Sequence, residues 1–278
     1  MNTPGESRRI DASLVSILER LPVLSYYAKT RGWHYVISWL HRFTGVSLMI
    51  VLMIYAYSSS SLPGVNVSNA SNAEMKVILS PIFLFLAWIS SLPMSFHALN
   101  GGRLILYELF GRRNDEEMIH WIFGLTAAYA VMIGLMMVMK NQHASAFFFW
   151  LMAAFSGAVA AYIVASRIRG KRHSVLWKLQ RISGAFLFIT APAYLLFWCL
   201  NPGQINGIQE VAAGAQNFFV RLVALAAITG ALSHAGYGLF SIGSDYTSSR
   251  ITRAGMTALV IAIIAVLAVL VFRLILVV

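Results

Sequence analysis

Long apolar stretches are the feature of this 278-residue chain that most constrains its fold. A helix crosses the hydrocarbon core of a bilayer with about 20 predominantly apolar residues, and several stretches here reach that length. They do not alternate apolar and polar residues, as the strands of a membrane barrel do. Helices also bond their own backbone polar groups, which lipid requires. The sequence therefore predicts an all-α, polytopic membrane helical bundle.

Seven membrane-spanning segments are predicted from apolar length and spacing. They are residues 35–58, 77–106, 118–139, 146–166, 180–200, 217–243 and 254–274. The fourth follows the third after only a short polar turn that contains His143. Residues 1–32 are polar and basic, and within them 11–21 has the apolar spacing of a short interfacial helix, with Asp11 as its N-cap.

Charge places the chain in a membrane rather than on nucleic acid. The formal net charge is +11, yet only 11% of the residues are charged. Basic residues that flank membrane helices are expected on the cytoplasmic side, so we predict lipid contact and no nucleic-acid partner. With the N-terminus inside, loops 59–75 and 201–216 face outward and contain no Lys or Arg. The basic residues left on the outer side are Lys76, Lys140, Arg221 and Arg273.

This bias predicts a multi-pass protein of the cytoplasmic membrane, with the N-terminus in the cytoplasm and the C-terminus outside. The single cysteine, Cys199, lies in an apolar stretch. One thiol cannot form an intrachain disulfide or hold an iron–sulfur cluster, which needs several thiolates. Any such cluster must therefore belong to a partner.

Two related halves follow from a repeated motif. Residues 40–45 read Leu-His-Arg-Phe-Thr-Gly, and residues 179–184 read Leu-Gln-Arg-Ile-Ser-Gly. We therefore predict an N-terminal arm (1–32), a first three-helix repeat (33–140), a linking helix with a basic loop (141–178) and a second three-helix repeat (179–278). A three-helix unit that begins inside ends outside, so the linking helix allows both repeats to run in the same direction.

Each half also contains one histidine inside an apolar stretch. His97 is followed by Gly101 and Glu108, and His234 by Gly238 and Asp245, so each histidine precedes a glycine by four residues and an acid by eleven. An ionisable residue deep in a membrane helix is a functional candidate by default. The alternative is a histidine that joins helices by hydrogen bonds.

Neutral imidazole is a good axial ligand for haem iron, so we predict that His97 and His234 bind one haem b between the halves. Gly101 and Gly238 lie one turn further on the same helix faces and let a flat macrocycle approach, or serve close helix packing. Eleven residues of helix measure about 16 Å, which is the distance from each histidine to its acid at the cytoplasmic end. Both histidines are therefore predicted to lie in the cytoplasmic half of the membrane. His143 is the outer-side histidine, so a second haem is not expected.

Polar residues gather at the cytoplasmic ends of the predicted helices. Arg42 and Arg103 are candidates to bind haem propionates or a quinone carbonyl, and His41 is a weaker one. The repeat-mate of Arg42, Arg181, is expected to extend toward the headgroups. A hydroxyl, a cation, a carboxylate and a phenol can bind a quinone head group and manage its protons. The predicted quinone-binding residues are Ser38, Arg42, Asp245 and Tyr246.

These motifs resemble a known family. Ser38–Gly45 and His97-x-x-x-Gly101-x-Arg103 resemble the larger cytochrome b membrane-anchor subunit of succinate dehydrogenases and fumarate reductases. His234-x-x-x-Gly238, followed by Asp245-Tyr246, resembles the smaller anchor subunit. The motifs occur in family order, as if the two subunits were fused, while the linking helix lies outside the resemblance.

The resemblance implies an anchor for a flavoprotein subunit and an iron–sulfur subunit, through which electrons pass between succinate and a quinone. It assigns the haem b ligands to His97 and His234. It assigns the quinone contacts to Ser38, Arg42 and Tyr246, with Asp245 beside them and the iron–sulfur subunit completing the pocket. The chain alone is not expected to oxidise succinate, since it carries no flavin or dinucleotide motif.

Two alternatives remain open at this point. A secondary transporter built on repeats would place polar residues near the membrane midplane, whereas here they lie toward one face. A haemless anchor of a related membrane oxidoreductase would make His97 and His234 structural.

Overall fold

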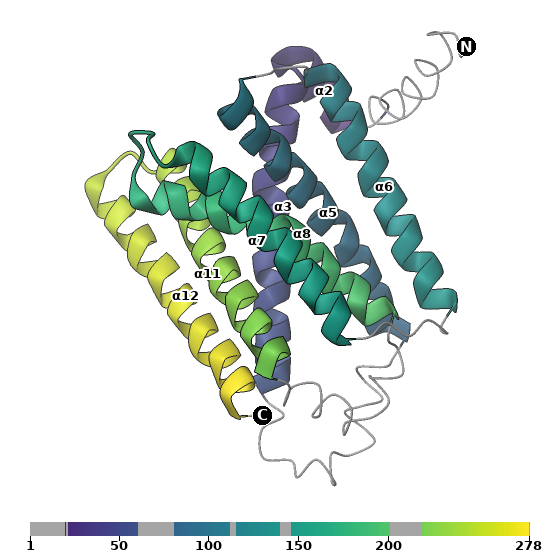
Figure 1. Ribbon diagram of the computed structural model, residues 1–278. Coiled ribbons are helices and arrows are strands. Elements are labelled where there is room, and N and C mark those ends of the chain that lie inside the picture. The colour runs from purple at the N-terminus through teal and green to yellow at the C-terminus, as the bar shows by residue number, and fades with distance from the viewer. Residues whose placement is uncertain are drawn as a thin grey trace.

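The computed structural model describes residue 20 and residues 22–60, 81–111, 115–139, 146–200 and 218–277. The described part is helical and contains no strand. Figure 1 shows the bundle. Its helices are α2 (Pro22–Arg31), α3 (Trp33–Ser60), α5 (Pro81–Phe110), α6 (Asp115–Met139), α7 (Ala146–Ile168), α8 (Val175–Leu200), α11 (Phe218–Tyr246) and α12 (Arg250–Val277).

The predicted all-α bundle is confirmed, and the described part of each of the seven predicted segments falls on one helix. Residues 77–80 and 217 of these segments lie outside the described residues. In the described ranges, six of these helices are long and apolar enough to cross a membrane. The spans are Trp33–Ile54, Met118–Met136, Phe147–Ile168, Val175–Phe197, Phe218–Tyr246 and Arg250–Phe272. The six do not include the thirty-residue α5, so its crossing stays a prediction.

The N-terminal arm contains a helix that was not predicted. α2 is separated from α3 by Gly32, whose φ of 80° is left-handed and therefore suits glycine. The amide of Gly32 donates to the carbonyl of Ala28, which closes the end of α2. Of the predicted interfacial helix at 11–21, all but residue 20 lies outside the described residues.

Four helices form the centre of the bundle. α3, α5, α8 and α11 pack in a closed ring of neighbours, α3 on α5, α5 on α8, α8 on α11 and α11 on α3. α6 packs against α5 and α8, and α12 against α11 and α3. α7 packs mainly along α8, and Figure 1 shows it in front of that helix.

This arrangement relates the two predicted repeats to one another. Exchanging α3 with α8, α5 with α11 and α6 with α12 converts each of these packing pairs into another observed pair. α7 has no counterpart in the exchange. The repeat boundaries at 33–140, 141–178 and 179–278 remain a prediction, and the packing supports two equivalent halves plus one extra helix.

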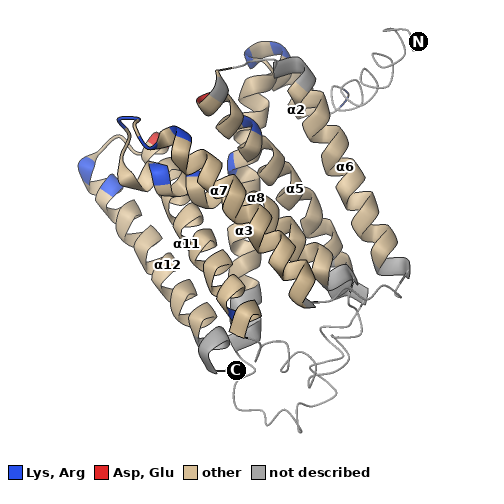
Figure 2. Cartoon of the chain, viewed as in Figure 1, with Lys and Arg blue, Asp and Glu red and all other residues tan. Residues whose placement is uncertain are grey.

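Charged residues gather at one end of the bundle. Figure 2 shows most of the described Lys and Arg around α2, the α7–α8 loop and the α11–α12 loop, with few at the other end. α12 finishes at the end opposite α2 (Figure 1). The two observations agree with opposite locations for the termini, and the assignment of the basic end to the cytoplasm stays a prediction.

Candidate haem and quinone site

His97 on α5 and His234 on α11 face each other across the centre of the bundle. Their ring centres are 6.1 Å apart and the rings are nearly perpendicular, with an interplanar angle of 86°. A metal–imidazole bond is about 2 Å long, so one metal atom bound by both rings would hold their centres roughly this far apart. The structure therefore brings together the two histidines that the sequence paired.

Each ring bonds a backbone carbonyl through Nδ1, and Nδ1 of His97 also lies 3.4 Å from the hydroxyl oxygen of Thr44. Nδ1 of His97 lies 3.0 Å from the carbonyl oxygen of His41, and Nδ1 of His234 lies 3.1 Å from that of Gln180. A carbonyl oxygen only accepts, so Nδ1 carries the proton in each ring and Nε2 carries the lone pair. Neither Nε2 has a hydrogen-bond partner among the described residues. Each Nε2 is thus available as a ligand. The bond from Nδ1 to a carbonyl fixes the orientation of each ring, as in metal-binding histidines.

These bonds also tie each histidine to the helix that begins its own repeat. His97 joins α5 to α3, and His234 joins α11 to α8. The alternative of a histidine that bridges helices is therefore partly realised. It uses only one nitrogen of each ring and leaves the other available.

Two glycines in the repeated motif make room for the rings. A Cβ on Gly45 would lie 2.9 Å from Cε1 of His97, and one on Gly184 would lie 3.0 Å from Cε1 of His234. Contacts this short force a shift of the ring. The sequence showed both glycines at matching motif positions, but their function was missed because nothing in one sequence says which side chain faces a glycine.

We expect Gly45→Ala to displace His97 and to lower the haem content of the purified complex at least several-fold. The matched control is Gly124→Ala in α6, where a Cβ meets nothing within 4 Å and alanine favours the helix by about 1 kcal/mol. Haem quantified per chain in both variants is the measurement. Equal haem content in the two would contradict the assigned function of Gly45.

His41 lies against His97 rather than on its own. The two rings are stacked, with centres 4.0 Å apart and an interplanar angle of 7°. A Cβ on Gly101 would lie 3.5 Å from Cε1 of His41, and a Cβ on Gly238 would lie 3.5 Å from the side-chain Nε2 of Gln180. The predicted glycines therefore lie under equivalent side chains in the two halves.

Buried polar side chains with atoms that make no hydrogen bond accompany the histidines on α3 and α5. Arg103 is 5% exposed, stacks its guanidinium 5.2 Å from the ring centre of Tyr107, and has no hydrogen bond at Nε or Nη1. The amide of Asn100, the hydroxyl of Tyr107 and Nδ1 of His41 are also buried without hydrogen-bond partners in the described part. Such groups are costly unless something bonds them. Their cationic and neutral donors fit the carboxylates of a haem.

The predicted quinone residues lie at the basic end, where α3 and α11 meet. Nη2 of Arg42 is 2.7 Å from Oδ2 of Asp245, and Nη1 donates to the hydroxyl of Tyr246 at 3.4 Å. All three are open to the surroundings, and Tyr246 is 70% exposed. Ser38 is exposed one turn before Arg42 on α3, with no hydrogen bond to these residues. The structure thus assembles three of the four predicted residues.

An equivalent ion pair joins the other two central helices. Nε and Nη2 of Arg181 on α8 each lie 2.6 Å from a carboxylate oxygen of Glu108 on α5. This carboxylate holds Arg181 in a two-point contact, and the expectation that Arg181 extends toward the headgroups stays a prediction. The spacing of Glu108 from His97 matched that of Asp245 from His234 and was the available signal.

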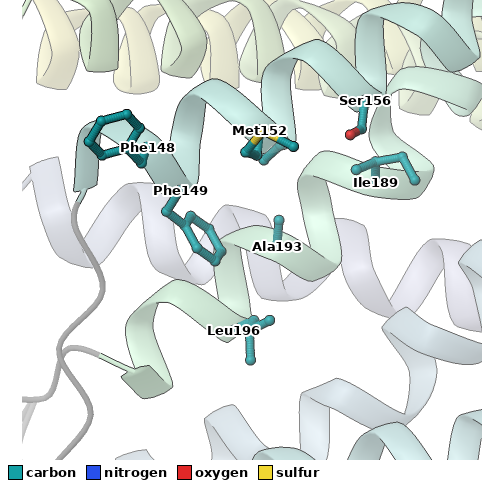
Figure 3. A pocket seen from close by; sticks show the side chains of 8 residues that line it. Phe148, Phe149, Met152, Ser156, Ile189, Ala193 and Leu196 are labelled. Atoms are coloured by element: carbon teal, nitrogen blue, oxygen red, sulfur yellow. The ribbon is translucent and has the colours of Figure 1, made fainter.

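An open apolar groove lies away from this site. It has a volume of about 530 Å³ between α7 and α8, and its lining is almost entirely apolar. Figure 3 shows its side chains on these two helices, with Ser156 as the one hydroxyl. No histidine or charged residue lines it, so it is not where the predicted cofactor or quinone chemistry lies.

A protein-family model matches most of the chain. The model of the succinate dehydrogenase/fumarate reductase transmembrane subunit matches the chain twice, over residues 21–134 and 164–272. Residues 135–163, between the matches, include most of α7. Neither the curated proteins nor the solved structures include a match to the chain.

Proposed function

Because the chain belongs to the succinate dehydrogenase/fumarate reductase transmembrane-subunit family, and is thus a membrane subunit of that oxidoreductase complex, we propose that it anchors the complex with one haem b and one quinone. The haem lies between His97 and His234, and the quinone near Arg42. The flavoprotein and iron–sulfur subunits dock at the basic end, which faces the cytoplasm, and electrons pass between the iron–sulfur subunit and the quinone pool.

The bond from Nδ1 to a backbone carbonyl that both histidines make is the observation that carries this proposal. Each ring donates Nδ1–H to a backbone carbonyl and keeps Nε2 free. Among the described residues, no group of three or more His, Cys, Asp and Glu side chains could hold a metal ion. Two imidazoles alone suit a metal whose other ligands come from a macrocycle. Arg103, His41 and Tyr107 supply donors for its carboxylates.

When bound, the haem supplies a one-electron redox centre next to the quinone. The chain holds that cofactor through two rings fixed by backbone carbonyls, in a region of low dielectric. At the basic end, the Arg42 guanidinium donates to a quinone carbonyl, and the Tyr246 hydroxyl, 3.4 Å away, donates to the same head group. Asp245 orients Arg42, delivers protons to the head group as the quinone is reduced, and accepts them as the quinol is reoxidised.

A reduced-minus-oxidised absorption spectrum of the purified complex, with haem quantified per chain, tests the cofactor. One low-spin b haem per chain supports the proposal. A complex with flavoprotein and iron–sulfur subunits but no haem would leave His97 and His234 with a structural function only.

Replacing Tyr246 by Phe tests the quinone residues separately. The ring remains and the hydroxyl is lost while Arg42 still donates, so we expect succinate:quinone turnover to fall about tenfold, less than the roughly 100-fold or more that a general acid or base contributes, while the haem spectrum is unchanged. Turnover with ubiquinone and menaquinone analogues is the measurement. Unchanged kinetics with both would remove Tyr246 from the quinone site.

A further inference from the structure

The two repeats present two related arginine–carboxylate pairs, and they are not equally open. Arg42 and Asp245 are 37% and 47% exposed in their side chains, whereas Arg181 and Glu108 are 22% and 34% exposed. α3 and α8 begin at the same end of the bundle (Figure 1), so both pairs lie toward the basic end. A fold with two equivalent halves has two positions at which a quinone head group could bind.

The side chains at the second position are of the wrong kind for such a ligand. By the offset that relates Arg42 to Arg181, the residue equivalent to Ser38 is Trp177. By the offset that relates His97 to His234, the residue equivalent to Tyr246 is Leu109. A small hydroxyl residue and a phenol are thus replaced by a large indole and an aliphatic chain.

The hydrogen-bonding groups of Arg181 are also occupied. Nε and Nη2 bond Glu108, Nη1 donates to the side chain of Gln180 at 3.0 Å, and the guanidinium lies 4.9 Å from the ring centre of Trp177. Arg42 bonds Asp245 through Nη2 and reaches Tyr246 only at 3.4 Å, and its Nε has no partner among the described residues. Every nitrogen of Arg181 thus has a partner, whereas Arg42 keeps its whole Nε–H for a carbonyl oxygen.

The segment between α7 and α8, residues 169–174, packs over the second position. Nζ of Lys171 donates to the backbone carbonyl of Glu108 at 2.6 Å. The ring of His173 stacks on Trp177 with centres 3.9 Å apart, and Lys178 donates to the carbonyl of Arg169 at 3.1 Å. The segment is therefore held at both ends, and Lys171 attaches it to the backbone of Glu108, a member of the second ion pair.

We infer that residues 169–174 and Trp177 fill, at Arg181 and Glu108, the position that a quinone head group takes at Arg42 and Asp245, so that the chain has one quinone site at this end and not two. The inference rests on the proposed function. It gives the linking segment a second effect beyond connecting the repeats. By covering one of two related pairs, it leaves a single binding position.

A photoreactive azidoquinone, cross-linked to the intact purified complex and located by peptide mapping, tests this inference. We expect label on peptides that contain Arg42 or Tyr246, and none on 169–181 or on the peptide with Glu108. Label at both pairs would overturn the inference and leave the proposed function standing. If neither pair is labelled, and unlabelled quinone does not reduce the labelling elsewhere, the proposed function is overturned and the inference with it.

A matched variant gives a second, independent measurement. Arg181→Gln is expected to lower the midpoint of thermal unfolding of the complex, because Glu108 loses its partner, and to change the Kd of a quinone-site inhibitor by less than twofold. A tenfold or greater loss of inhibitor affinity in this variant would overturn the inference. If the variant does not assemble, the photolabelling map of the unaltered complex decides alone.

Discussion

Replacing His97 or His234 by Gly is expected to abolish the low-spin haem absorption of the complex. Each ring supplies one Nε2 that has no other partner in the described structure, and glycine supplies no nitrogen. One remaining imidazole cannot fill two axial positions, so the haem is lost or becomes high-spin. Absorption and electron paramagnetic resonance spectra, with haem quantified per chain, are the measurements.

Exogenous imidazole sharpens this experiment. A His→Gly change leaves a space of the size of the missing ring, so millimolar imidazole is expected to restore the low-spin signal in both variants. His41→Phe is the comparison, since it keeps a ring stacked on His97 but has no nitrogen. It is expected to retain a low-spin spectrum, because His41 stacks beside the ligand and is not one itself. Normal low-spin haem in both His→Gly variants would contradict the ligand assignment.

The second large effect is expected for Arg42→Gln. Removing this cation takes away the donor to the quinone and leaves Asp245, 2.7 Å away, without its partner. Loss of one preorganised donor typically costs about 100-fold or more in rate, so succinate:quinone turnover is expected to fall by about that factor. Arg42→Lys is expected to recover only part of it, because an ammonium keeps the charge but not the planar fork of donors.

Two controls separate this effect from loss of the complex. Succinate oxidation with a soluble dye that accepts electrons from the flavoprotein and iron–sulfur subunits is expected to be unchanged, as is the haem spectrum. Quinone turnover near that of the unaltered complex would remove Arg42 from the quinone site. A parallel loss of dye reduction would show instead that the substitution releases the soluble subunits.

Much of the fold could be predicted because apolar length dominates it. The described parts of the seven predicted segments lie on α3 and α5 to α12, with boundaries that differ by a few residues. α2 was missed because its composition is polar and its buried face is small. Its end at Gly32 depends on a left-handed backbone that the sequence alone does not show.

The site was predicted as residues but not as contacts. The matched spacing of His97 and His234 was enough to pair them. It could not show that Gly45 and Gly184 accommodate the rings, or that Glu108 binds Arg181, since these contacts join helices whose relative rotation is set by packing. Ser38 was grouped with Arg42 by helical spacing, and the structure leaves it one turn away without a hydrogen bond.

The two ion pairs have a consequence for how the protein is made. Arg42 belongs to the first repeat and Asp245 to the second, while Glu108 belongs to the first and Arg181 to the second. Neither pair can close until the ribosome has delivered the later helix. The helices of the first repeat are therefore made before the partners of Arg42 and Glu108 exist. The Glu108 pair can close once α8 has been made, and the Arg42 pair only once α11 has been made, one helix before the end of the bundle.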